Sequence, residues 1–159
     1  MNCGSILLAS SILGSALLVV AAERPAPPAV FTSAQAESGR TAYENTCAKC
    51  HTPTLLGRTG KPGELPPVSS LSEDYQKFIG PRGYVPALAG KIFNDHWGSR
   101  TAAQLIARFQ ETVDFFHFEG ADKDFTVNLT AYILQVNGAK AGDQPLTRST
   151  AAVVSSIIQ

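Results

Sequence analysis

The sequence predicts an all-α domain of about three to five helices joined by long loops. Apolar residues recur at helical spacing in several segments, and these segments begin beside a Ser or Thr that can cap a helix. We find no alternation of apolar and polar residues of the kind typical of a half-buried strand. With 159 residues, of which 44% are hydrophobic, the chain is long enough for one domain with its own core.

Capping residues set the expected starts of the helices in the first half of the chain. Thr32 or Ser33 can cap a first helix that runs to the first cysteine of the domain. Residues 57–83 are rich in Gly and Pro, so they are expected to be mostly loop, with one short helix capped by Ser72. A further helical turn is expected over 87–93.

Two longer helices are expected in the second half. Thr101 and Gln104 can form a capping box, which opens a helix that ends near residue 113. Thr126 is expected to cap the final helix, and Gly138 to end it. The helix-packing core is expected to contain Tyr43, Phe93, Leu105, Ile106, Phe109, Leu129, Tyr132, Ile133 and Val136.

The chain divides into four parts. Residues 1–22 are expected to be a signal peptide, because an apolar run ending in small residues precedes the first charged side chain, Glu23. The run is close to the shortest length that spans a bilayer, so an uncleaved anchor remains an alternative. Residues 23–31 read as a Pro-rich linker and 32–142 as the domain, while 143–159, rich in Gly, Ser and Thr, read as a flexible tail.

Charged side chains are balanced, with 13 Lys and Arg against 13 Asp and Glu. The chain therefore lacks the large positive field of a nucleic-acid binder or of a protein that binds anionic membranes. We expect neither kind of partner.

The segment Cys47-Ala48-Lys49-Cys50-His51 carries the chemistry that the sequence predicts. Two thiols three positions apart at a helix end can each add to a haem vinyl group, and the adjacent imidazole can then bind the iron as its proximal ligand. The remaining cysteine, Cys3, is expected to be lost with the signal peptide. The pattern predicts one covalently bound haem c.

Other sites that contain a Cys-x-x-Cys pair fit the sequence less well. A zinc ribbon needs a second pair of ligands, but the remaining histidines, His96 and His117, are far apart in the sequence. A thioredoxin-like site needs a βαβ context, which the sequence does not predict. A plain disulfide would suit an exported protein, but it leaves the His directly after the second Cys without a role.

From residue 39 to 142, the sequence resembles a class I cytochrome c domain. Beyond the haem motif, the likeness is to the single domains and cytochrome subunits that serve bacterial dehydrogenases. It is carried by Val85-Pro-Ala-Leu-Ala-Gly90, Phe93, Trp97, Ser99-Arg-Thr101 and Leu129-Thr-Ala-Tyr-Ile-Leu134.

The resemblance implies roles for four further residues. The carbonyl of Pro86 would accept the Nδ1 hydrogen of His51 and fix its tautomer, while Leu88 would pack on the haem face. Trp97 and Arg100 would lie at the haem edge and the propionates. Without the resemblance, Pro86 is interpreted as a turn proline, Trp97 as a core aromatic and Arg100 as a solvated charge.

The sixth iron ligand departs from the family pattern. Class I cytochromes usually supply a methionine from the loop before the last helix, but the one methionine of this chain is Met1. The corresponding loop, 113–125, holds His117 among three phenylalanines. His117 is therefore the expected second metal ligand, and an open or water-bound position and His96 are the alternatives.

A small domain with one six-coordinate haem mainly exchanges single electrons at the haem edge. We therefore expect an electron carrier rather than an enzyme, either free or as the cytochrome subunit of an oxidoreductase complex. Its partners would be redox proteins such as a periplasmic dehydrogenase or a terminal oxidase. The alternative is a five-coordinate haem that binds a small gas or peroxide, in a sensor or a weak peroxidase.

Residues 57–84 look like an insertion between the haem motif and the Pro86 segment. They can be interpreted as a docking element for a partner dehydrogenase or as a lid over the haem edge.

The N-terminal segment generates a first prediction. Because an apolar run precedes Glu23 and c-type maturation occurs outside the cytoplasm, the protein should be periplasmic and should begin near Glu23. Mass spectrometry of the intact protein measures this. Membrane-bound protein that retains residues 1–22 would instead support the anchored alternative.

Overall fold

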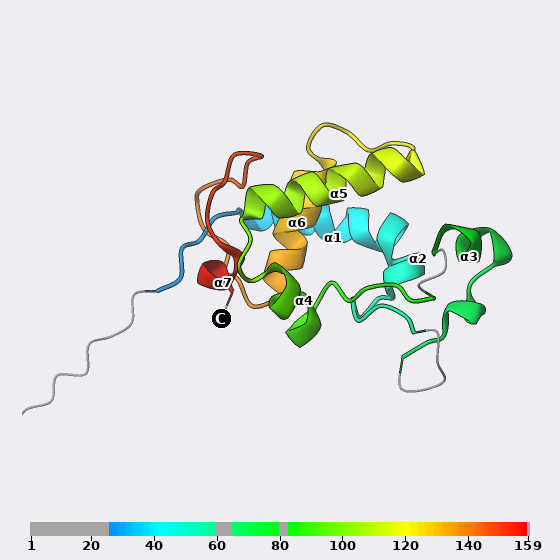
Figure 1. Cartoon of the computed structure of the whole chain (residues 1–159). Coiled ribbons are helices and arrows are strands. Elements are labelled where there is room, and N and C mark those ends of the chain that lie inside the picture. Colours follow the sequence, from blue (N-terminus) through cyan, green and yellow to red (C-terminus); the bar gives the residue numbers. More distant parts are fainter. Residues whose placement is uncertain (1–25, 60–64, 80–82, 159) are drawn as a thin grey trace, which may run out of the picture.

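The computed structural model describes residues 26–59, 65–79 and 83–158 (Figure 1). The predicted signal peptide, 1–22, and the first residues of the linker lie outside the described residues. Within the described ranges, no helix is long and apolar enough to cross a membrane.

The described part of the chain is helical, with isolated β-bridges and no strand. This confirms the all-α prediction, and five of its α-helices have seven or more residues. The elements are α1 (Ser33–Ala42), a π-helical turn (Tyr43–Cys47), α2 (Ala48–His51), a 3-10 turn (Val68–Ser70), α3 (Glu73–Ile79), α4 (Gly90–Trp97), α5 (Ala102–Phe116), α6 (Phe125–Val136) and α7 (Val154–Ile157).

The centre of the fold is the crossing of α1 and α6, which form the most extensive helix contact. The two backbones touch at Gly39, where a Cβ atom would lie 1.9 Å from the carbonyl oxygen of Asn128. Next to this point, the rings of Tyr43 and Tyr132 pack at 5.5 Å. A larger residue at Gly39 would force the helices apart.

Local sequence signals account for the starts of α1 and α5. Both helices have a capping box, in which Thr32 pairs with Gln35 and Thr101 with Gln104. The sequence predicts the box at Thr101, and at Thr32 only a cap. Gly138 follows α6 with a φ of 98°, as a helix-ending glycine does. Of the predicted core, Tyr132 is half-buried and the buried residues are Tyr43, Phe93, Leu105, Ile106, Phe109, Leu129 and Ile133.

Three local predictions are wrong. The turn expected at 87–93 is the longer helix α4, which begins later. Thr126 does not cap α6, because it lies inside the helix, where its hydroxyl donates to Gln110 Oε1 of α5 at 3.1 Å. Val136, in the last turn of α6, is 40% exposed.

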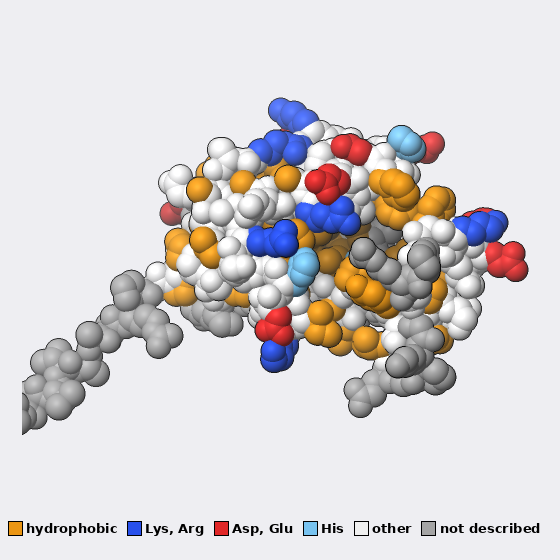
Figure 2. All heavy atoms as spheres, in the orientation of Figure 1, with side chains coloured by type: hydrophobic (Ala, Val, Ile, Leu, Met, Phe, Trp, Pro, Cys, Tyr) orange, Lys and Arg blue, Asp and Glu red, His pale blue; other side chains and the backbone are white. Residues whose placement is uncertain are grey.

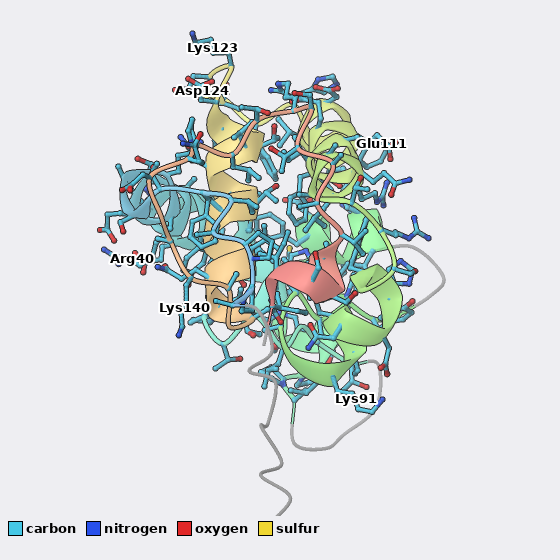
Figure 3. All side chains as sticks on the ribbon, turned by 90° about the vertical axis from the view of Figure 1, so that its left-hand side faces the viewer. Arg40, Lys91, Glu111, Lys123, Asp124 and Lys140 are labelled. Atoms are coloured by element: carbon cyan, nitrogen blue, oxygen red, sulfur yellow. The ribbon has the colours of Figure 1, made fainter. Side chains whose placement is uncertain are left out.

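Charged side chains lie outside this core. Figure 3 shows Arg40 of α1, Lys91 of α4 and Glu111 of α5 pointing away from the packed helices. Arg40 pairs with Glu37 and Glu44 on its own exposed helix face. Such exposed pairs contribute little to stability, so burial of apolar side chains holds the helices together.

The end of the chain does not form the flexible tail predicted for 143–159. Leu146 is buried, and its backbone N–H and carbonyl both bond to the Gln35 side chain of α1. The N–H of Val154 donates to the Arg100 carbonyl at 2.8 Å. Val154 and Ile157 are fully buried, and α7 packs beside α4 (Figure 1).

The start of the domain also differs slightly from the prediction. Phe31, assigned to the linker, is fully buried, and its carbonyl accepts from the Gly142 N–H at 2.8 Å. Both ends of the domain therefore join one core.

This packing predicts the effect of shortening a side chain near the C-terminus. Ile157→Ala should lower the free energy of unfolding by about 2–5 kcal/mol, because it leaves a cavity against α4. Val153→Ala is the matched control, since Val153 is 38% exposed. Urea unfolding followed by circular dichroism measures both variants. Equal stability of Ile157→Ala and wild type would mean that the segment is not packed in solution.

Candidate haem site

The haem motif lies where the first helix changes its winding. After α1, the chain makes a π-helical turn over Tyr43–Cys47 and then one α-helical turn, α2. π-helical turns are rare and frequently occur at functional sites. The hydroxyl of Tyr43 donates to the carbonyl of Thr52, the residue at which the chain leaves the helix with a φ of 67°. Tyr43 thus fixes the exit of the motif.

His51 is oriented by the carbonyl of Pro86, which lies 2.9 Å from its Nδ1. This is the contact that the resemblance implies, and it leaves Nε2 as the nitrogen available for a metal. Burial lowers the pKa of His51, and the hydrogen bond to Pro86 opposes this shift only in part. The neutral imidazole, which is the form that binds metals, is therefore favoured.

The loop after His51 approaches the Pro86 segment closely. Gly57 donates to the His51 carbonyl at 3.0 Å, and a Cβ atom on Gly57 would lie 2.2 Å from the Val85 carbonyl oxygen. Gly57 also has a φ of 78°, which favours glycine. The next residue, Arg58, exchanges two backbone hydrogen bonds with Val85. Together these contacts hold the Pro86 carbonyl near the ring of His51.

The Arg58 side chain caps the motif helix. Its Nε donates to the Cys50 carbonyl at 3.0 Å, and its Nη2 donates to the Lys49 carbonyl at 2.9 Å. Its Nη1 donates to Ser70 Oγ at 2.8 Å. Because the carbonyls at the end of a short helix lack helical partners, a guanidinium there satisfies them and complements the helix dipole.

Cys47 and Cys50 are free thiols. Burial raises the pKa of both, and for Cys50 the nearby Arg58 and Lys49 oppose that shift. Catalytic Cys-x-x-Cys sites lower the pKa of a thiol to generate a thiolate. The surroundings of these thiols are therefore unlike those of a thioredoxin-like site.

No group of three or more His, Cys, Asp and Glu side chains that could hold a metal ion occurs within the described ranges.

Large apolar side chains are exposed close to the motif. Figure 2 shows a hollow below α5 that is rimmed by hydrophobic side chains. Monomeric proteins rarely leave such a surface uncovered, and a flat apolar ligand would bury it. The exposed apolar residues of the motif loop, the insertion and the end of α5 are Leu56, Tyr75, Phe78, Tyr84, Phe115 and Phe116.

The chemistry of this set of residues fits haem c. Two free thiols can form thioethers, an oriented neutral imidazole can bind iron, and apolar side chains can cover a porphyrin face.

The structure places the other residues implied by the resemblance in or beside the core. Leu88 and Trp97 are buried and belong to the same apolar cluster. Arg100 is exposed, and its guanidinium carbon lies 5.1 Å from the centre of the Trp97 ring, a cation–π distance. Since part of the guanidinium remains in solvent, it can pair with a carboxylate there.

His117 does not lie buried among phenylalanines as expected. It is exposed and ends α5 in the left-handed conformation, with a φ of 50°. Its side chain borders a cavity of about 210 Å³ with polar walls, which α5, α6 and the loop between them line. No residue of the haem motif or of 85–97 lines this cavity. His96, on α4, is also exposed, and its ring packs edge-on against Trp97 at 5.3 Å.

The insertion contacts the end of α5. Phe78 of α3 meets Phe116 edge-on at 5.4 Å, and Phe116 stacks on Phe118 at 5.6 Å. This part of the insertion therefore packs on the end of α5, and both interpretations, a lid over a haem edge and a docking element, stay predictions.

The sequence analysis missed the roles of Gly57 and Arg58. A glycine soon after the motif indicates a turn. The neighbouring sequence does not indicate that the Val85 carbonyl, far along the chain, leaves no room for a side chain at Gly57. Arg58 bonds to the carbonyls of Lys49 and Cys50, nine and eight residues earlier, and no motif signals that contact.

Comparison of the chain with protein-family models, curated proteins and solved structures gave no match.

The tight approach at Gly57 predicts the effect of adding a methyl group. Gly57→Ala should lower the free energy of unfolding by about 1–3 kcal/mol more than Gly120→Ala, as overpacking does. Gly120 is the matched control, because its φ of 79° is nearly the same but open space surrounds its Cβ position. Urea unfolding of both variants measures the difference. Equal losses would show that backbone strain, rather than contact with Val85, explains the glycine.

Proposed function

We propose that the chain is an exported, monohaem c-type cytochrome that carries single electrons. The observation that carries the proposal is the hydrogen bond from His51 Nδ1 to the Pro86 carbonyl, directly after two free thiols. A proximal ligand needs such a partner, because the hydrogen bond fixes its tautomer and its orientation.

Each residue of the site has a separate part in binding. Cys47 and Cys50 would attach the haem through thioethers, and His51 would present Nε2 to the iron. Arg58 holds the motif helix, and its positive charge near Cys50 would favour the ferrous state. Leu88 would cover one haem face, while Trp97 and Arg100 would bind the edge and the propionates.

The haem would supply a one-electron couple at an edge close to the surface. A redox partner would approach at that exposed edge. Partners of this kind are a periplasmic dehydrogenase or a terminal oxidase, in keeping with the export that the N-terminal sequence predicts.

Covalent attachment is the direct test of the proposal. Haem should remain with the chain after denaturing electrophoresis and acid–acetone extraction, because two thioether bonds survive both treatments. Cys47→Ala and Cys50→Ala should each leave at most one bond and reduce haem staining, and His51→Ala should remove the proximal ligand. Cys3→Ala is the control and should stain like wild type. Haem that extracts freely from wild-type protein would disprove the c-type assignment.

The position of His117 favours a second candidate function. Because this side chain is exposed and borders a cavity without motif residues, the sixth iron position can remain open or hold water. An open iron would bind a small gas or peroxide, as in a sensor or a weak peroxidase.

Spectra of His117 variants distinguish the two candidates. If His117 is the sixth ligand, the ferric protein should be low-spin, and His117→Ala should make it high-spin and able to bind carbon monoxide once reduced. His96→Ala tests the other histidine: a low-spin wild type that only this variant turns high-spin would make His96 the sixth ligand. A wild type that is high-spin and insensitive to His117→Ala would support the open-site candidate.

A further inference from the structure

Asn137 ends α6 and binds the segment that carries the Pro86 carbonyl. Its Nδ2 donates to the Leu88 carbonyl at 3.0 Å, and its Oδ1 accepts from the Gly90 N–H at 2.9 Å. The same Nδ2 donates to the Ile133 carbonyl at 2.8 Å. The side chain is only 8% exposed, and both its donor and its acceptor groups bond to backbone.

Few other polar contacts hold this segment. Within the described ranges, Asn137 and His51 are the two side chains that hydrogen-bond to residues 86–90. The Leu88 N–H also donates to the Leu55 carbonyl at 2.7 Å. The Pro86 carbonyl therefore lies between the Val85 pairing on one side and the Asn137 contacts on the other.

We infer that Asn137 is a positioning residue for His51. By holding Leu88 and Gly90 against the end of α6, it keeps the Pro86 carbonyl within bonding distance of His51 Nδ1. Gly90 has a φ of 76°, and glycine has few conformational restrictions of its own. The contacts of the Asn137 amide therefore restrict the backbone of residues 86–90. Asn137 thus helps to determine which ring nitrogen carries the proton, although it does not touch the ring.

The consequence for redox chemistry rests on the proposed function. A strong hydrogen bond at Nδ1 makes the imidazole a stronger donor to iron, which favours the ferric state. Loosening the Pro86 carbonyl should weaken that bond and raise the midpoint potential of the haem.

Two variants test the inference in the mature, haem-loaded protein. Asn137→Leu keeps roughly the volume of the side chain and removes its donors and its acceptor without adding a charge, and Asn137→Ser is a milder change if the first variant does not fold. Each should speed exchange of the His51 Nδ1 proton about tenfold or more, measured by NMR on the ferrous protein. Each should also raise the midpoint potential.

Thr130→Val is the matched control. Thr130 lies on the same helix, is fully buried and donates to the Thr126 carbonyl at 2.7 Å, so its loss also removes a buried hydrogen bond. It should lower stability without changing the exchange rate or the potential. Asn137 variants that behave in the same way would overturn the inference.

The outcome is separable from that of the proposed function. Haem staining of the same samples reports whether the chain carries covalent haem. In a chain without haem, ring ¹⁵N shifts give the fraction of His51 in the Nδ1–H tautomer. That fraction should fall in both Asn137 variants and stay unchanged in Thr130→Val, and an unchanged fraction in the Asn137 variants would again overturn the inference.

Discussion

The hydrogen bond between His51 and the Pro86 carbonyl constrains the whole middle of the molecule. It joins two points 35 residues apart, so the chain between them must leave and return at one place. The base of this loop is closed where Arg58 pairs with Val85 and where Gly57, which has no side chain, lets the two backbones approach. Once the base is closed, extra length costs little, since loop-closure entropy grows only slowly with the number of residues. A long insertion can therefore lie next to the motif without disturbing it.

The helices provide the rigid frame on which this closure depends. α1 delivers the motif, and α6 crosses α1 at Gly39 and ends at Asn137 beside the Pro86 segment. Both segments that form the site thus attach to the same helix crossing. The motif continues directly from α1, and the Pro86 segment is hydrogen-bonded to the end of α6. Because interiors pack densely, a shift at the crossing would be transmitted to both. The position of the motif relative to the Pro86 segment is consequently fixed by the contact between α1 and α6.

The sequence predicts the features that depend on neighbours along the chain. The cap at Thr32 and the capping box at Thr101 involve residues three apart, and both occur. Thr126 was expected to cap α6, but it lies inside the helix, and its hydroxyl donates to Gln110 on another helix. The apolar residues near the C-terminus were too few to predict a helix, yet tertiary packing buries Val154 and Ile157. The resemblance implied the Pro86 contact, whereas Gly57 and Arg58 act on distant backbone and carry no local signal.

The two sides of the candidate site are held by different kinds of contact. On the His51 side, hydrogen bonds to backbone groups hold the segments, several of them made by the side chains of Tyr43, Arg58 and Asn137. On the side of α3 and the end of α5, contacts are between aromatic rings that remain partly exposed, such as Phe78 and Phe116. Those rings gain stability only when something apolar covers them, because exposed apolar area is unfavourable in water. A haem held at His51 would supply that cover, so its binding would order the aromatic side through the same burial that stabilises the fold.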